Sequence, residues 1–230
     1  MWGSIVLDDG HLRARSPTRS LAALLADVAD GRFPAADGSV TIMPQPSPRD
    51  AGVIDLTAHA VIFTDAEPDW VRGLLPPGDL SGPVAPRFLQ ALAERTGRRA
   101  QSTDMLTVTT SRPGPPAIEL TPDAEPAHPR IARALRYRDD VRAWQTDGGV
   151  LLIGRGVAGR WEVAIEVDAD HRGKGLGRDL AAAARHLVPG GAPLWAQIAP
   201  GNAASVRAFL AAGFTPVGAE ALLTADPLRS

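Results

Sequence analysis

Two glycine-rich segments of the sequence have a spacing that could bind a phosphate group. In the first, Gly154, Gly156 and Gly159 spell G-x-G-x-x-G after an apolar run. A dinucleotide fingerprint needs a strand, a glycine turn and then a helix, so that the phosphates meet the positive end of a helix dipole. The next residues, RWEVAIEV, alternate at period two and indicate a strand instead of a helix. We therefore predict a hairpin whose glycines serve the turn, and NAD-linked redox chemistry is a weak hypothesis.

The second segment, residues 172–177, satisfies the requirement that the first one fails. It reads RGKGLG and lies between the strand RWEVAIEV and the Ala-rich, helical run DLAAAARHL. Main-chain N–H groups at a helix start can converge on an anion, and glycines let a phosphate approach without a Cβ in the way. Lys174, the only lysine of the chain, lies here as either an ordinary surface charge or a phosphate contact. The spacing is not that of a Walker A loop, but it predicts an anion site.

The elements that must position this loop follow from the apolar patterns around it. IARALRYR is a helix candidate, and DVRAWQT, GVLLIGRG and RWEVAIEV are strand candidates joined by tight turns, which indicates an antiparallel meander. After the loop we expect a helix that stops near Pro189, a strand PLWAQIA and a helix NAASVRAFLAAGF. Asn202 lies near the N-cap of that last helix and Gly213 at its end.

The first half of the chain has an α/β or α+β pattern of its own. SLAALLADVA and PRFLQALAERTG indicate helices, and GVIDLTAHAVIFT and MLTVTT indicate strands. Between residues 111 and 130 the sequence SRPGPPAIELTPDAEPAHPR is rich in proline and predicts little regular structure beyond a short strand at residues 117–120. We place the domain boundary there, between residues 1–115 and residues 116–230. That the first part is a diverged half-copy of the second stays open.

The composition argues against several classes of protein. A net charge of −2 gives no field that would hold a polyanion, so nucleic acid is not an expected partner. No apolar run approaches the roughly 20 residues of a membrane span, and MWGSIVLDDGHLRAR lacks the order of a signal peptide, so we expect a cytoplasmic protein. The absence of cysteine removes a cysteine thioester intermediate. The scattered histidines predict no metal site, and no G-x-S-x-G elbow supports a serine hydrolase.

Two ordered motifs make the second half resemble the GNAT superfamily of acyl-CoA-dependent N-acyltransferases. The first is R-x-x-G-x-G at Arg172, Gly175 and Gly177, and the second is a later helix that begins N-x-x-[AS] at Asn202 and ends in G-F at Phe214. The resemblance covers roughly the last hundred residues. It implies an α/β (α+β) fold with a mixed, mostly antiparallel central sheet flanked by helices, and acetyl-CoA or another acyl-CoA as co-substrate.

The resemblance also implies which residues hold the co-substrate. The first motif would cradle the pyrophosphate of coenzyme A, and the main chain at the end of the preceding strand would bind the pantetheine arm. The residues concerned are Ile165, Val167, Arg172, Gly173, Lys174, Gly175, Leu176, Gly177, Arg178, Asn202 and Phe209.

The sequence departs from the family at two positions that matter for catalysis. Family members often carry a carboxylate on the strand before the second motif and a tyrosine within its helix, where this chain has Gln197 and Phe209. Neither can transfer a proton, and Tyr137, the only tyrosine, lies upstream of the strands. We therefore predict Glu162 and Glu166 as the base, acting directly or through water, because they share one face of a strand that should be covered on both sides. The alternative is that this face meets solvent or pairs with arginines.

These observations predict an N-acyltransferase that moves an acetyl or other short acyl group to a primary amine by direct attack in a ternary complex. The resemblance implies that a main-chain N–H near Val167, where the strands splay in this family, would stabilise the tetrahedral oxyanion. The acceptor is a small molecule or a protein amine, and a homodimer is compatible with the sequence. Residues 1–115 would shape the acceptor pocket or cover the core. The alternative function is a non-catalytic acyl-CoA-binding or regulatory module that kept the loop and lost turnover.

Overall fold

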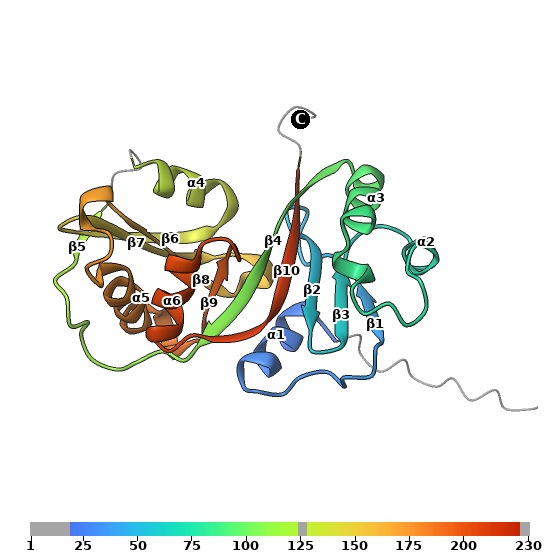
Figure 1. The fold of residues 1–230 in the computed structure, drawn as a ribbon, viewed down its shortest axis with the longest axis horizontal. Helices are drawn as coiled ribbons and strands as arrows, with labels where there is room; N and C mark the ends of the chain where they lie inside the picture. The colour runs from blue at the N-terminus through green and yellow to red at the C-terminus, as the bar shows by residue number, and fades with distance from the viewer. Residues whose placement is uncertain (1–18, 124–127, 226–230) are drawn as a thin grey trace, which may run out of the picture.

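The computed structural model describes residues 19–123 and 128–225, which form one ten-stranded sheet with helices on both faces (Figure 1). The strand order is β1-β3-β2-β10-β4-β9-β8-β7-β6-β5. Neighbouring strands are antiparallel except in the pairs β1–β3 and β8–β9. The predicted fold class, a mixed and mostly antiparallel sheet flanked by helices, is thereby confirmed. The N-terminal stretch expected to lack a signal peptide lies outside the described residues.

The strands have the following bounds: β1 (Val40–Met43), β2 (Ala51–Leu56), β3 (His59–Phe63), β4 (Arg98–Thr109), β5 (Thr121–Asp123), β6 (Asp139–Thr146), β7 (Gly149–Arg155), β8 (Trp161–Val167), β9 (Leu194–Ile198) and β10 (Thr215–Ala225). The α-helices are α1 (Leu21–Ala29), α2 (Pro68–Gly73), α3 (Pro86–Thr96), α4 (Pro129–Tyr137), α5 (Leu176–Leu187) and α6 (Ala203–Ala211). Among the described residues, none of these helices combines the length and the apolarity needed to cross a membrane.

The predicted meander and the helices around it are present in the second half. Strands β6, β7 and β8 pair in sequence order as antiparallel hairpins. The G-x-G-x-x-G segment is the hairpin turn between β7 and β8, and Gly159 adopts a φ of 75° within it. Asn202 caps α6, because its side chain accepts a hydrogen bond from the main-chain N–H of Ser205 at 3.1 Å, and Gly213 follows the helix with a φ of 89°.

The first half differs from its prediction in detail. The run at residues 52–64 is two strands, β2 and β3, which form a hairpin around Ala58. Ala58 has a φ of 51°, so a residue other than glycine or proline makes the turn and leaves no turn signal in the sequence. The short strand predicted at residues 117–120 is wrong, because β5 begins only at Thr121. Strand β1 and helix α2 in this half are additions that the sequence patterns did not predict, as is β10 at the end of the second half.

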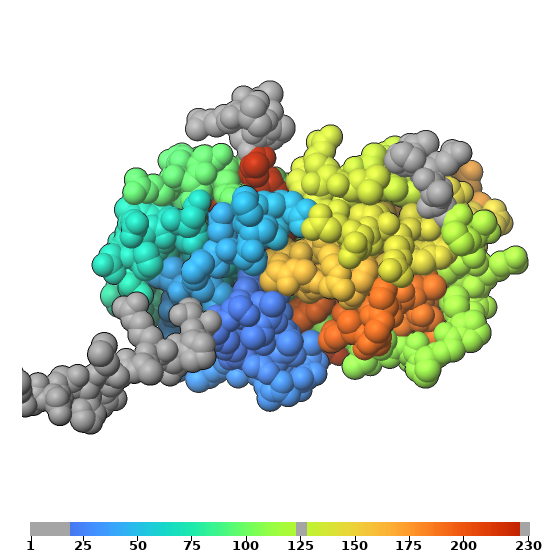
Figure 2. Space-filling model, turned by 180° about the vertical axis from the view of Figure 1, so that it is seen from behind, coloured from blue at the N-terminus to red at the C-terminus, as the bar shows by residue number. Residues whose placement is uncertain are grey.

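The two parts of the chain share the sheet. Strand β4, from the N-terminal part, lies between β9 and β10 of the C-terminal part, and β10 in turn pairs with β2. Figure 1 shows β4 and β10 side by side through the middle of the molecule, and Figure 2 shows the blue and cyan N-terminal surface directly against the yellow C-terminal surface. The domain boundary proposed for residues 111–130 therefore marks a change in composition within one continuous sheet.

The helices divide between the two faces of the sheet. On one face, α1 packs against Ile54 and Leu106, and α4 packs against Leu152. On the other face, α3 packs against Val53. Helices α5 and α6 pack with Val163 in a separate cluster on the same face. Between α1 and α4 the first face carries polar side chains in place of a continuous apolar core. We call this the α1/α4 face, and the candidate site lies on it.

Candidate active site

The glycine-rich loop leads directly into helix α5. Gly173 and Gly175 have φ values of 75° and 94°, which side-chain-bearing residues rarely adopt. A Cβ added at Gly173 would meet no atom within 4 Å, so this side of the loop is open. The first N–H groups of α5, starting at Leu176, have no carbonyl partner within the helix. The loop therefore presents main-chain donors at a helix N-terminus, as an anion site requires.

Strands β8 and β9 separate beside this loop. Their parallel pairing is limited to Trp161 with Leu194 and Glu162 with Trp195. Asp168 donates its N–H to the carbonyl oxygen of Gly148, the residue before β7, and successive N–H groups of an extended strand alternate in direction. The N–H and C=O groups of Ile165 and Val167 consequently point toward the β9 side, beyond the last β8–β9 pair.

A cavity of about 1110 Å³ joins the loop, the gap between β8 and β9, and part of the α1/α4 face. Most of the residues predicted to bind the co-substrate line it. These are Ile165, Val167, Arg172, Gly173, Gly175, Leu176, Gly177, Arg178, Asn202 and Phe209. Lys174 lies in the loop and is exposed but is absent from the cavity lining, so its role as a phosphate contact stays a prediction.

Two of these residues also have structural contacts. Arg172 donates from Nε to the carbonyl oxygen of Val167 at 3.1 Å, which ties the loop back to the end of β8. Phe209 is only 4% exposed and packs edge-on against Phe214, with ring centroids 4.9 Å apart. A phenylalanine in this setting supplies an apolar wall and no proton.

Glu162 lines the same cavity and is held by four donors. Its carboxylate accepts hydrogen bonds from Arg138 Nε, Arg160 Nε and Gln197 Nε2, each at 2.9 Å, and from the N–H of Val157 at 3.3 Å. Burial raises the pKa of Glu162, but the charges of Arg160 and Arg138 outweigh burial and lower the pKa to about 2. A carboxylate that binds protons so weakly is disfavoured as a general base.

The turn before β8 is shaped to admit this carboxylate. A Cβ at Gly156 would lie 2.2 Å from Glu162 Cδ, so no larger residue fits there without displacing the ion pairs. The φ of Gly156 is −104°, which any residue could adopt. Of the glycines in the first segment, Gly159 serves the turn by its conformation and Gly156 serves Glu162 by the space it leaves.

Glu166, the second predicted base, is more open. Its carboxylate accepts a hydrogen bond from Arg130 Nε at 2.7 Å, and 41% of its side chain is exposed. The hydrogen bond from Arg130 lowers the pKa of Glu166. Both glutamates thus pair with arginines, which is the alternative that the sequence left open for this face of β8.

Three further side chains in the cavity were missed by the sequence analysis: Asp104 on β4, Glu220 on β10 and Tyr137 on α4. Residues paired directly across neighbouring strands share a face. Glu220 pairs with Asp104, so both lie on the α1/α4 face. Tyr137 lies upstream of the strands in sequence, but α4 brings it to the same cavity. No local pattern marks these positions, because the sheet assembles them from distant segments.

Glu220 and Arg160 complete a buried network with Glu162. Arg160 Nη2 donates to Glu220 Oε2 at 2.7 Å, and Gln197 Nε2 donates to the same oxygen at 2.9 Å. Burial raises the pKa of Glu220 more than the charge of Arg160 lowers it. Gln197 donates to both glutamates, so a carboxylate at this position would place a third negative charge between them.

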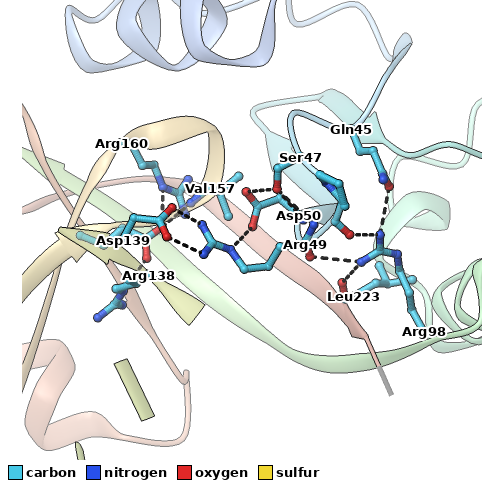
Figure 3. A network of polar contacts seen from close by, with 12 residues as sticks. Gln45, Ser47, Arg49, Asp50, Arg98, Arg138, Asp139, Val157, Arg160 and Leu223 are labelled. Atoms are coloured by element: carbon cyan, nitrogen blue, oxygen red, sulfur yellow. Dashed lines mark hydrogen bonds and ion pairs between the residues drawn. The ribbon is translucent and has the colours of Figure 1, made fainter. Parts of the chain in front are cut away.

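An ion-pair chain connects the N-terminal part to this region. Arg49 donates to Asp139 at the start of β6 at 3.0 and 3.2 Å and contacts Asp50, so its guanidinium lies between the two carboxylates (Figure 3). Arg49 and Asp50 also line the cavity. The segment before β2 therefore forms one wall of the site. No group of three potential metal ligands occurs in the part of the chain that the structure describes.

Comparison with known proteins finds a match to a family model within the second half of the chain. Residues 136–214 match the family model described as the acetyltransferase (GNAT) family. No curated protein sequence matches the chain at a significant level.

The solved structures with low similarity to this chain include the following two. A GCN5-related N-acetyltransferase from Kribbella flavida has 20% sequence identity and a TM-score of 0.40, with 60% of this chain and 63% of that chain covered. A GNAT-family acetyltransferase from Colwellia psychrerythraea has 11% identity and a TM-score of 0.39, with 59% and 60% covered. This chain therefore spans less than two thirds of the length of either protein. The match to the family model is confined to residues 136–214.

Proposed function

We propose that the protein moves an acetyl or other short acyl group from acyl-CoA to a primary amine, a function supported by the match of residues 136–214 to the GNAT acetyltransferase family model. The observation that carries this proposal is the common cavity: the loop at the start of α5, the gap between β8 and β9, and the polar α1/α4 face open into one space. A donor held at the loop and an acceptor held on the α1/α4 face could meet within it. The acceptor is a small-molecule or protein amine.

The loop fits the pyrophosphate of coenzyme A. Gly173 and Gly175 bring the main chain to the surface without a Cβ, and the N–H groups at the start of α5 supply donors with a positive dipole. Arg172 and Arg178, which line the cavity, add positive charge beside them. These residues would bind the diphosphate and fix the direction in which the rest of the co-substrate extends.

The main chain of β8 fits the next part of the co-substrate. The peptide groups of Ile165 and Val167 face the gap between the strands, where the sheet supplies them with no partner strand. They would hydrogen-bond the amides of the pantetheine arm, and one N–H at this point would stabilise the oxyanion that forms when the thioester is attacked. Arg172 already shows that the carbonyl of Val167 accepts hydrogen bonds from outside the sheet.

Transfer by direct attack is the simplest mechanism that the chain allows. Without cysteine no thiol can carry the acyl group, so the amine nitrogen attacks the thioester carbonyl while both substrates are bound. In this scheme Glu162 orients Arg138, Arg160 and Gln197 and stays ionised. Glu166 lies at the exposed edge of the cavity, where proton exchange through water is open to it.

A non-catalytic acyl-CoA-binding module is the second candidate. It is favoured by Gln197 and Phe209, which stand where the resemblance implies a carboxylate and a tyrosine. Gln197 is committed to bridging Glu162 and Glu220, and Phe209 is buried. Such a protein would hold acyl-CoA and release no product.

Coenzyme A release distinguishes the two functions. The protein would be incubated with acetyl-CoA and, in turn, phenylethylamine, spermidine and a lysine-containing peptide, while free thiol is measured and acetyl-CoA binding is followed by calorimetry. An acyltransferase releases thiol in step with an acetylated amine. Tight binding without thiol release from any acceptor would leave only the binding module.

A variant of the loop provides the control for binding. Gly175→Glu places a side chain and a negative charge at a φ of 94° beside the proposed diphosphate. We expect acetyl-CoA affinity to fall by about 100-fold or more, which corresponds to about 2.7 kcal/mol. Gly190→Glu makes the same change at a φ of 65° outside the cavity and should leave affinity unchanged. Equal affinities of Gly175→Glu and the wild type would contradict the proposed donor site.

A further inference from the structure

We propose that Asp104, supplied by the N-terminal part of the chain, is the catalytic residue that takes the proton from the acceptor amine. This inference rests on the acyltransferase function proposed above. It also gives residues 1–115 a chemical task in addition to the four strands, β1 to β4, that they add to the sheet.

The carboxylates of the cavity differ in their ion pairs. Asp50, Glu162, Glu166 and Glu220 each have an arginine within ion-pair distance. Among the described residues, Asp104 has none, and its hydrogen bond comes from Ser102 Oγ at 2.9 Å. A carboxylate that accepts a proton from a substrate should not already be neutralised by a guanidinium, because the ion pair stabilises its charged form. Asp104 is the carboxylate of this cavity that meets the condition.

The sheet places Asp104 opposite the donor loop. Met105, the residue after Asp104, pairs with Ile198, the last residue of β9. Asp104 therefore lies beside the end of β9. Its side chain is on the α1/α4 face, as that of its partner Glu220 is. Ile198 and Ala199 line the cavity beside it. The co-substrate would enter from the β8 side of β9, and Asp104 would meet the acceptor from the β4 side.

The residue paired with Asp104 across the sheet carries a buried oxygen without a hydrogen-bond partner in the part of the chain that the structure describes. Glu220 is its direct partner across β10 and β4, and Glu220 lines the cavity although its side chain is fully buried. Glu220 Oε2 accepts from Arg160 and Gln197, whereas Oε1 has no hydrogen-bond partner among the described residues. A buried oxygen without a donor is costly unless a ligand supplies one. A primary amine held by Asp104 could supply it, since the nitrogen carries more than one N–H.

The electrostatic surroundings favour proton uptake by Asp104. Burial raises its pKa, against smaller opposing effects of the hydrogen bond from Ser102 and the charge of Arg133 on α4. Glu220 faces it from β10 and Tyr137 lines the same cavity from α4. The paired charges of Arg160 and Glu162 lie further along the same face toward β8.

The proton and electron balance of the step is simple. The lone pair of the neutral amine forms the C–N bond, and one N–H proton passes to Asp104. The oxyanion re-forms the carbonyl as the C–S bond breaks, and the electron pair leaves on sulfur. The thiolate takes up a proton from solvent and Asp104 releases its proton to solvent, which yields the amide and free coenzyme A thiol.

Asp104→Asn is the direct test, with acetyl-CoA as donor and phenylethylamine, spermidine and the lysine-containing peptide as acceptors. We expect kcat to fall by about 100-fold or more, in the range that general base catalysis contributes. The calorimetric Kd for acetyl-CoA should stay within about twofold, because Asp104 lies away from the donor loop. In the wild type kcat/KM should decline on the acid side as Asp104 is protonated, and Asp104→Asn should remove that decline.

Two further variants separate chemistry from structure. Formate added to Asp104→Ala should restore part of the lost rate, because the small carboxylate can occupy the space of the missing side chain and accept the proton. Asp55→Asn is the matched control: Asp55, on β2, is also half-buried with a pKa raised by burial, but it does not line the cavity. It should keep wild-type kcat.

The outcomes distinguish this inference from the proposed function. A wild type that binds acetyl-CoA but acetylates none of the acceptors overturns the proposed function and the role of Asp104 with it. A wild type that turns over while Asp104→Asn keeps kcat within about threefold overturns the role of Asp104 alone. Loss of the acid-side decline in Glu162→Gln or Glu220→Gln, with the decline retained in Asp104→Asn, likewise assigns the base elsewhere.

Discussion

The two ends of the cavity are built in different ways. The donor end is local: a strand, a glycine loop and the first turn of a helix follow one another within residues 161–187. The acceptor end is not, because Asp104, Glu162, Gln197 and Glu220 come from four different strands. A local site leaves a motif in the sequence, whereas a site assembled across a sheet leaves its residues scattered and unmarked.

The difference predicts how each end tolerates the loss of the N-terminal part. If the donor end depended only on local structure, residues 116–230 would bind acyl-CoA on their own. The sheet indicates otherwise, since removal of residues 1–115 takes away β1 to β4. Strand β10 then loses both of its neighbours, β2 and β4, and β9 loses β4, so three strand edges are exposed. We expect this fragment to lack cooperative thermal unfolding, and co-expression with residues 1–115 to restore it. A fragment that folds and binds acetyl-CoA alone would make the donor end independent of the shared sheet.

The buried network of the acceptor end should be its most sensitive feature. Arg160 is 4% exposed in its side chain and pairs with both Glu162 and Glu220, so Arg160→Met leaves two buried carboxylates without their common partner. The expected loss in the free energy of unfolding is about 3–5 kcal/mol. Arg72→Met, at an exposed pair with Asp69, is the control and should change stability by less than about 0.5 kcal/mol. Similar urea midpoints for the two variants would show that the network adds no stability.

The low pKa of Glu162 predicts a pH dependence with a definite sign. Its folded-state pKa of about 2 lies below the ordinary value of 4.5, so its ionised form stabilises the fold above about pH 4.5, and this contribution is lost as the pH falls toward 2. Glu220 has a raised pKa and acts in the opposite direction, so the wild type alone is not the test. The destabilisation caused by Glu162→Gln should be about 2–3 kcal/mol larger at pH 7 than at about pH 3. Urea unfolding at both pH values measures it, and an equal effect at both would contradict the ion-pair account.

The smallest effect is expected at the outer wall. Arg49 and Asp139 join the N-terminal part to β6 at the surface, and 70% of the Asp139 side chain is exposed (Figure 3). A double-mutant cycle with Arg49→Ala and Asp139→Ala should give a coupling of about 0–1 kcal/mol, because exposed ion pairs are screened by water and salt. A coupling above about 2 kcal/mol would mean that this pair, and not the shared sheet, holds the two parts together.

The same division explains what the sequence predicted and what it could not. The meander of β6 to β8, the helix after the loop and the caps at Asn202 and Gly213 were all predicted, because period-two alternation and capping residues are local signals. The hairpin of β2 and β3 was read as one run because Ala58 turns the chain without glycine or proline. Strand β10 was missed because Pro216 and Gly218, at an irregularity in its pairing with β4, interrupt the strand pattern.

The residues of the candidate site also fall into those that the sequence predicted and those that it could not. All but one of the residues predicted to hold the co-substrate line the cavity, and Lys174 is the exception. Glu162 and Glu166 were chosen from the alternation of a single strand, which correctly placed them on one face but could not reveal the arginines opposite them. Asp104 and Glu220 could be found only from the register of β4 against β10.

A crystal structure of the protein with acetyl-CoA would test the proposed donor and acceptor ends together. We expect the diphosphate on the main-chain N–H groups of residues 173–177 and the pantetheine arm along Ile165 and Val167. The acetyl group would then lie between β8 and β9, open to Asp104. Acetyl-CoA bound at the hairpin of residues 154–159, or with its thioester outside the gap between β8 and β9, would refute this arrangement.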